Sequence, residues 1–201
     1  MIDKHALIIS ILMLVGTATS FANSGDLKST YRGVGVSAGM QTTSAAMFAH
    51  NGDKPYTTFN AEGGVLYMTK IGQSRFYFET GAYLGLINMG FDYYHDGPLE
   101  RVVSRHCRLK IPFNCDYMIP LAGGFELIPS LGLGFTASVV SNISNETVED
   151  TGLGFGIVFP HLGISLMKGN FMLGLSHEFF ASIQSEIPFN GILQLNFTYL
   201  F

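Results

Sequence analysis

Apolar and polar residues alternate along most of the chain beyond residue 30. In the final segment, Leu193, Leu195, Phe197, Tyr199 and Phe201 are apolar or aromatic, and the residues between them are more polar. A period of two is typical of a β-strand with one apolar face and one wetter face. The same alternation predicts eight strands, near residues 31–42, 57–69, 74–90, 105–117, 125–138, 154–167, 170–183 and 189–201.

The predicted connections between these strands alternate in length. Long connections at 43–56, 91–104 and 139–150 alternate with short ones at 70–74, 118–124 and 168–169, and the seventh connection fits least well. Bacterial outer-membrane barrels have an even number of strands, long outside loops and short periplasmic turns. The alternation therefore predicts that both termini lie on the periplasmic side.

Composition makes a water-exposed surface improbable. Charged residues form only 13% of the chain and the mean hydropathy is +0.30, whereas soluble domains average about 25% charged residues. The longest apolar stretches, 119–140 and 152–167, contain several Gly and Pro residues, which disfavour a continuous helix. The remaining way to cross a bilayer is a closed barrel. We therefore expect an all-β, eight-stranded, antiparallel, up-and-down transmembrane β-barrel.

The N-terminus reads as a secretory signal peptide. Lys4 and His5 precede an apolar core at 6–18, and Ser20-Phe21-Ala22 places small residues before a cleavage site. The predicted organisation is a signal peptide at 1–22, a short periplasmic segment at 23–30 and the barrel at 31–201.

The alternation also predicts which charged side chains face the barrel interior. An eight-stranded barrel is just wide enough for its side chains to fill, and buried charges have to be paired. We expect a structural salt-bridge network, with a narrow ion or proton path as the alternative. The predicted interior charges are Glu62, Glu79, Arg108, Lys110, Asp116, Glu126 and Glu178.

Other candidate chemistry is weak. Ser176, His177 and Glu178 are adjacent, but neighbouring strand residues point to opposite faces. Asp92–Asp96 is more typical of a solvated loop than of a metal site. Cys107 and Cys115, if on one strand, lie about 26 Å apart at ~3.3 Å per residue and cannot pair. No catalytic residue, cofactor or metal is predicted, and a net charge of −4 gives no basic surface for nucleic acid.

The stretch "RLKIPFNCDYMIP…FELIPSLGLGF" resembles an outer-membrane β-barrel family of Bacteroidetes that includes the PorT-like proteins. The matching motifs are Leu109-Lys110-Ile111-Pro112 and the segment from Pro129 to Gly134. The resemblance implies the fold and the compartment, and transfers no catalytic residue. The terminal pattern of Phe197, Tyr199 and Phe201 resembles the signal that the barrel assembly machinery reads on its clients.

Taken together, these patterns favour a non-enzymatic outer-membrane barrel with a packed polar interior. Its expected role is in membrane structure, surface adhesion or docking within an envelope assembly. Its expected partners are outer-membrane lipid, the barrel assembly machinery and an unidentified envelope or surface protein. The alternatives are a lipid-modifying barrel enzyme and, third, an exported lipocalin-like binder.

Overall fold

The structure is a computed structural model that describes residues 27–43, 56–93, 100–143, 153–182 and 191–201. The predicted signal peptide lies outside these residues. The long strands are β1 (Thr30–Thr43), β2 (Tyr56–Lys70), β3 (Phe76–Tyr93), β4 (Glu100–Tyr117), β6 (Phe125–Ile143), β7 (Leu153–Lys168), β8 (Phe171–Ser182) and β9 (Gly191–Leu200). A two-residue strand, β5 (Ile119–Pro120), and a 3-10 turn, η2 (Ala122–Gly124), connect β4 to β6.

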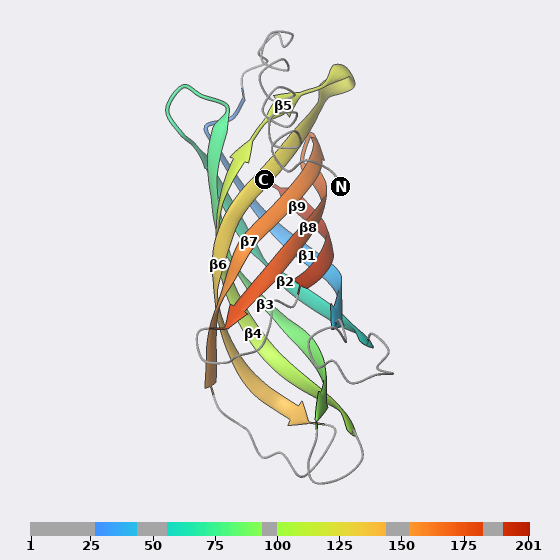
Figure 1. The fold of residues 1–201 in the computed structure, drawn as a ribbon. Coiled ribbons are helices and arrows are strands. Elements are labelled where there is room, and N and C mark those ends of the chain that lie inside the picture. The colour runs from blue at the N-terminus through green and yellow to red at the C-terminus, as the bar shows by residue number, and fades with distance from the viewer. Residues whose placement is uncertain (1–26, 44–55, 94–99, 144–152, 183–190) are drawn as a thin grey trace, which may run out of the picture.

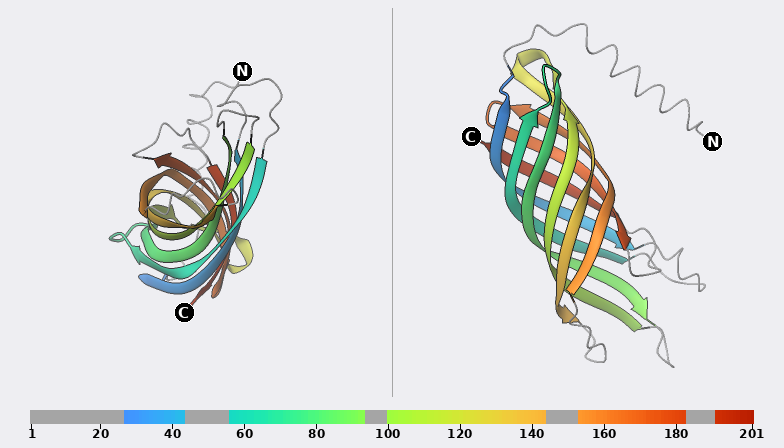
Figure 2. Two further views of the ribbon diagram at one scale, coloured as in Figure 1. Left: turned by 90° about the horizontal axis from the view of Figure 1, so that it is seen from below. Right: turned by 90° about the vertical axis from the view of Figure 1, so that its left-hand side faces the viewer.

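Every long strand pairs antiparallel with its neighbours in the chain, and the sheet closes on itself. β1 pairs with β9, with Val36 opposite Phe197, and β4 pairs with β6, with Ile111 opposite Phe135. Figures 1 and 2 show the resulting barrel from the side and along its axis. The predicted eight-stranded, antiparallel, up-and-down barrel is confirmed.

One end of the barrel carries the short connections, at 71–75, 118–124 and 169–170, together with the start of β1 and the end of β9. Gly72, Gly123, Gly124 and Gly169 have positive φ angles there, a conformation that glycine adopts at no steric cost. We call this the short-turn end. Much of the predicted long connections, at 44–55, 94–99 and 144–152, lies outside the described residues.

Three strands run further than the alternation predicted. β3 continues to Tyr93 and β4 begins at Glu100, and these two residues are opposite each other in the ladder. β6 continues to Ile143. The predicted connection at 91–104 is therefore mostly strand, because backbone pairing of the β3–β4 hairpin persists where the polar pattern suggested a loop. These strands project beyond the others at the end opposite the short turns (Figure 1).

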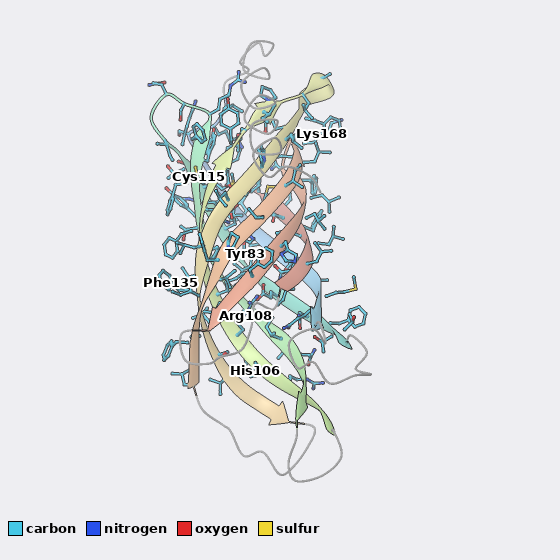
Figure 3. The ribbon with its side chains drawn as sticks, viewed as in Figure 1. Tyr83, His106, Arg108, Cys115, Phe135 and Lys168 are labelled. Atoms are coloured by element: carbon cyan, nitrogen blue, oxygen red, sulfur yellow. The ribbon has the colours of Figure 1, made fainter. Side chains whose placement is uncertain are left out.

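The outward face of the barrel is apolar. Side chains such as Phe135, drawn in Figure 3, point away from the barrel wall. Phe59 is 70% exposed and Leu84 62% exposed. Further exposed large apolar side chains are Val36, Val65, Leu109, Ile111, Leu131, Phe155, Ile164, Leu173 and Leu195. This outward set is the apolar belt of the barrel.

The lumen near the short-turn end is filled by apolar side chains. One of them, Tyr77, donates a hydrogen bond from its hydroxyl to the Lys28 carbonyl oxygen at 2.7 Å. We call the buried cluster the apolar plug; its members are Tyr31, Leu66, Met68, Tyr77, Met118, Ile128, Met167, Met172 and Leu200. Nearer the other end of the lumen, Ile87 on β3 and Ile192 on β9 are also buried. The interior is thus apolar at the short-turn end and polar in the middle, and at the other end Ile87 and Ile192 lie among buried polar residues such as Gln41, Thr58 and Asn60.

Irregularities in the ladder change which residues face inward. On β7, Val158 and His161 both lie on the inner side, and the pairing of β7 with β8 shifts register between them. Pro160 lies in this interval and has no backbone N–H to donate to the ladder. The resulting irregularity inverts the alternation along the rest of β7.

The described part of the chain holds no helix that is long and apolar enough to cross a membrane.

Candidate functional site

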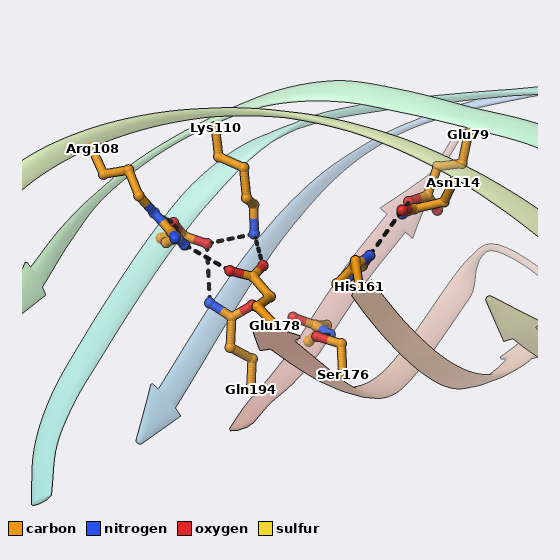
Figure 4. Close-up of polar contacts among 10 residues, drawn as sticks. Glu79, Arg108, Lys110, Asn114, His161, Ser176, Glu178 and Gln194 are labelled. Atoms are coloured by element: carbon orange, nitrogen blue, oxygen red, sulfur yellow. Dashed lines mark hydrogen bonds and ion pairs between the residues drawn. The ribbon is translucent and has the colours of Figure 1, made fainter. Parts of the chain in front are cut away.

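Four charged side chains meet in the middle of the lumen (Figure 4). Glu62 comes from β2, Arg108 and Lys110 from β4 and Glu178 from β8. Arg108 and Lys110 share a face because they are two residues apart on one strand. Exposed fractions are 4% for Glu62, 2% for Arg108, 7% for Lys110 and 0% for Glu178.

Each base in this group contacts both acids. Arg108 donates from Nε to Glu62 Oε1 at 2.7 Å, and from Nη2 to Glu62 Oε1 and to Glu178 Oε2, the last at 3.1 Å. Lys110 Nζ donates to Glu62 Oε2 at 2.8 Å and also to Glu178 Oε1. Gln194 Nε2 adds a bond to Glu62 Oε2 at 3.1 Å. We call this set the charge network.

The charge network is electrically neutral, with two acids and two bases. A buried ion pair is tolerated only when its geometry is good and its remaining polar atoms are hydrogen-bonded. The bonds run between β2, β4 and β8, so they tie together strands that are not adjacent in the sheet. The arrangement therefore acts as a polar core for the barrel.

Small residues make room for this core. An added Cβ at Gly85 on β3 would lie 2.8 Å from Glu62 Cα, closer than real side chains pack. Tyr83, also on β3, places its ring 5.2 Å from Lys110 Nζ. The absence of a side chain at Gly85 thus leaves room for Glu62, whereas the ring of Tyr83 packs against Lys110.

A second polar group lies nearer the short-turn end. Asn114 on β4 donates from Nδ2 to Glu79 Oε1 at 2.6 Å. His161 Nδ1 lies 2.9 Å from Asn114 Oδ1, and because an amide oxygen only accepts, the imidazole donates. Asp116 is fully buried and lies beside Glu79.

The seven predicted interior charges therefore fall into three groups. Glu62, Arg108, Lys110 and Glu178 form the charge network. Glu79 and Asp116 face the lumen but form no ion pair within the described residues. Glu126 is only half-buried and is paired with Pro120 in the short-turn connection, so it lies at the edge of the lumen instead of inside it.

The described residues contain no Ser–His–acid relay. Ser176 faces inward and its Oγ accepts a bond from Asn196 Nδ2 at 2.8 Å. His177 packs its ring 4.2 Å from that of Phe179, on the face opposite Ser176 and Glu178. His161 does face the lumen, but its hydrogen bond goes to Asn114.

A cavity of about 60 Å³ remains in the lumen between the apolar plug and the charge network. Polar residues outnumber apolar ones among its lining residues and include Glu79, Asn114, Ser130, His161, Ser176 and Asn196. A space of this size has room for water. Among the described residues, no three His, Cys, Asp or Glu side chains come together as a metal-binding cluster.

Two cysteines lie on the outer face of β4. Cys107 and Cys115 are free and exposed. Their side chains belong to the apolar face of a single strand, so they are not available to each other for a disulfide. The Asp92–Asp96 segment, considered above as a metal loop, lies outside the residues whose side chains are described.

Sequence reasoning missed the inward position of His161. The alternation alone does not place it, because the β7 irregularity shifts the inner face by one residue. The signal in the sequence is Pro160 inside a strand, since proline within a sheet marks a bulge or an edge.

No family model matches this chain, and no curated protein matches it either. Among solved structures, the chain is similar to Neisserial surface protein A at 11% identity, with 87% of this chain and 98% of that chain covered and a TM-score of 0.48. It is also similar to Ail, the attachment invasion locus protein of Yersinia pestis, at 12% identity, 87% and 100% coverage and a TM-score of 0.43. The outer membrane enzyme PagL is similar at 13% identity, 83% and 98% coverage and a TM-score of 0.36.

These likenesses have TM-scores below 0.5, and we transfer no function from them. The class of protein rests on the chain's own closed barrel and apolar belt. The resemblance to PorT-like proteins stays a prediction.

Proposed function

We propose that this protein is a bacterial outer-membrane barrel that works through its outer surface, in membrane structure, surface adhesion or docking within an envelope assembly. The observation that carries the proposal is the filled lumen. The neutral charge network occupies its middle and the apolar plug its short-turn end. Because the lumen of such a barrel is occupied, its outer surface is the part available to bind other molecules.

The apolar belt supports a membrane location over a soluble one. Phe59 and Leu84 are more than half exposed, and large apolar side chains are costly to leave in water. A lipocalin-like binder would need an apolar cavity and a wetter exterior. Here polar residues such as Glu79, Asn114 and His161 line the cavity, and the exterior is apolar.

The side chains suited to lipid chemistry do not support an enzyme. Ser176 lies in the lumen, where a lipid acyl chain has no room beside the charge network. His177 faces the belt but packs against Phe179. We therefore propose that the protein has no lipid-modifying activity.

The aromatic residues of β9 support recognition by the barrel assembly machinery. Phe197, Tyr199 and Phe201 lie on the outer face and are 46%, 40% and 65% exposed. They are accessible before the barrel enters lipid, and they sit on the strand that closes the barrel against β1. We propose that they form the recognition signal for the barrel assembly machinery, and that both termini are periplasmic.

Two measurements test the proposal together. Expressed in a Gram-negative host, the protein should sediment with the outer membrane. The purified, refolded barrel should release no product from labelled lipid A or phospholipid, and Ser176→Ala should behave as the wild type. Lipid turnover that Ser176→Ala abolishes would favour the enzyme, and recovery in the soluble periplasmic fraction would favour the exported binder.

A further inference from the structure

The described lumen holds more buried acid than base. Glu62, Glu79, Asp116 and Glu178 are the acids, and all four lie on inward positions. The bases of the charge network form their ion pairs with Glu62 and Glu178. Two carboxylates, Glu79 and Asp116, are therefore left without a paired positive charge among the described residues.

Asp116 is the more exceptional of the two. Its exposed fraction is 0%, and neither carboxylate oxygen has a hydrogen-bond partner among the described residues. Glu79 Oε1 accepts one bond from Asn114. Glu79 and Ser130 are the side chains that lie next to the Asp116 carboxylate. A charged group that is buried without a partner is strongly unfavourable.

The nearby basic side chains, Lys110 and His161, form their hydrogen bonds with other residues. Lys110 attracts Glu79, but its Nζ bonds go to Glu62 and Glu178. His161 donates to Asn114 and to neither carboxylate. Among the described residues, no base therefore forms an ion pair with Glu79 or Asp116.

We propose that Glu79 and Asp116 bind one hard divalent cation, Ca²⁺ or Mg²⁺. The available donors are oxygens: two carboxylates, and the Ser130 hydroxyl, since Ser130 is opposite Asp116 in the β4–β6 ladder. Oxygen donors of this kind suit Ca²⁺ and Mg²⁺. A charge of +2 neutralises both carboxylates.

The neighbouring cavity completes the site. Glu79 and Ser130 both line it, so water there reaches a cation held by the pair. Mg²⁺ in particular keeps several waters and uses one or two carboxylates, which explains why a cluster of three acidic or histidine ligands is not required. The cation would link β3, β4 and β6 on the short-turn side of the charge network. This inference goes beyond the proposed function and does not depend on it.

Enclosure determines how the site is loaded. Because Asp116 is fully buried, the cation enters during folding and is then retained. The test is to refold the full chain in detergent with Ca²⁺ or with Mg²⁺, dialyse it into metal-free buffer and measure bound metal by elemental analysis. Tb³⁺ is a second probe, because Tyr77 is opposite Asp116 in the β3–β4 ladder and tyrosine sensitises Tb³⁺ luminescence.

The wild type should retain one ion per chain, as one oxygen-donor site requires, and should sensitise Tb³⁺. Asp116→Asn and Glu79→Gln should lose both signals. Glu79→Gln keeps an oxygen for the Asn114 bond, so it is the variant expected to fold most readily. Glu126→Gln removes a half-buried carboxylate at the same end and should retain the ion.

Wild-type barrel that holds no metal after refolding with either ion would overturn the proposal, whatever the variants do. So would metal retention that survives in Asp116→Asn. An infrared band of a protonated carboxyl group at neutral pH, present in the metal-free wild type and lost in Asp116→Asn, would show that the pair shares a proton instead.

Discussion

Single residues decide whether the lumen can be packed with charge. Arg108 and Lys110 are each bonded to two carboxylates, so the removal of one side chain leaves others uncompensated. Glycine at position 85 is needed for space and not for a special backbone angle. We therefore expect large effects on stability from inward substitutions and small effects from substitutions of their outward neighbours.

Lys110→Met should lower the free energy of unfolding by about 3–5 kcal/mol, the cost of removing one partner of a buried ion pair. Glu62 and Glu178 would then share only Arg108. Arg32→Met, at an exposed position of β1, should stay within about 0.5 kcal/mol. Urea titrations of the barrel in lipid vesicles measure both, and equal effects would mean that the charge network contributes nothing.

Gly85→Ala should destabilise the barrel by roughly 1–3 kcal/mol, because the added methyl group overpacks the wall against Glu62. Gly63→Ala is the matched control on β2. A Cβ at Gly63 meets only ordinary contacts, at 3.7 and 3.8 Å, so this change should be near neutral. A tolerated Gly85→Ala in the same titration would show that Glu62 can move.

At the scale of the strand, the two-residue period predicted most of the facing. It placed Arg108, Lys110 and Glu178 inward and Leu131 and Phe135 outward, as the structure has them. It was least clear on β3, where the inner face carries Tyr77, Tyr83, Ile87 and glycines beside Glu79. It gave no account of β7, where the ladder irregularity places His161 inward.

The energetic cost of a charged side chain on the outer face should depend on its depth in the membrane. Phe135→Arg, near the middle of β6, should cost about 2–4 kcal/mol, and Leu121→Arg, in the short-turn connection, about 0–1 kcal/mol. Phe135→Leu controls for the loss of the ring. Folding titrations into vesicles compare the three, and an equal cost for both arginines would mean that the belt does not meet hydrocarbon.

Deletion of Phe201 should reduce outer-membrane yield in cells far more than it lowers the stability of refolded barrel. Its backbone N–H donates to the Arg32 carbonyl oxygen at 2.8 Å, so the deletion removes one bond at the end of the β1–β9 ladder. The remainder of that ladder is unchanged. Outer-membrane yield and heat-modifiable gel mobility are the two readouts, and a proportional fall in both would make the residue structural.

At the scale of the whole molecule, closure brings the site together. Arg108 lies 46 residues from Glu62 and 70 from Glu178 along the chain. The sequence predicted that these charges face the lumen. It could not predict which of them meet, because that depends on the strand stagger and on the register irregularities that accumulate around the barrel.

The lumen is packed, and we therefore expect that the barrel does not conduct. The direct measurement is single-channel recording of the purified barrel in planar bilayers, with a 16-stranded porin as the positive control. We expect no stable conductance steps of porin size, because the charge network and the apolar plug occupy the lumen. Stable porin-sized openings from the wild-type barrel would contradict it.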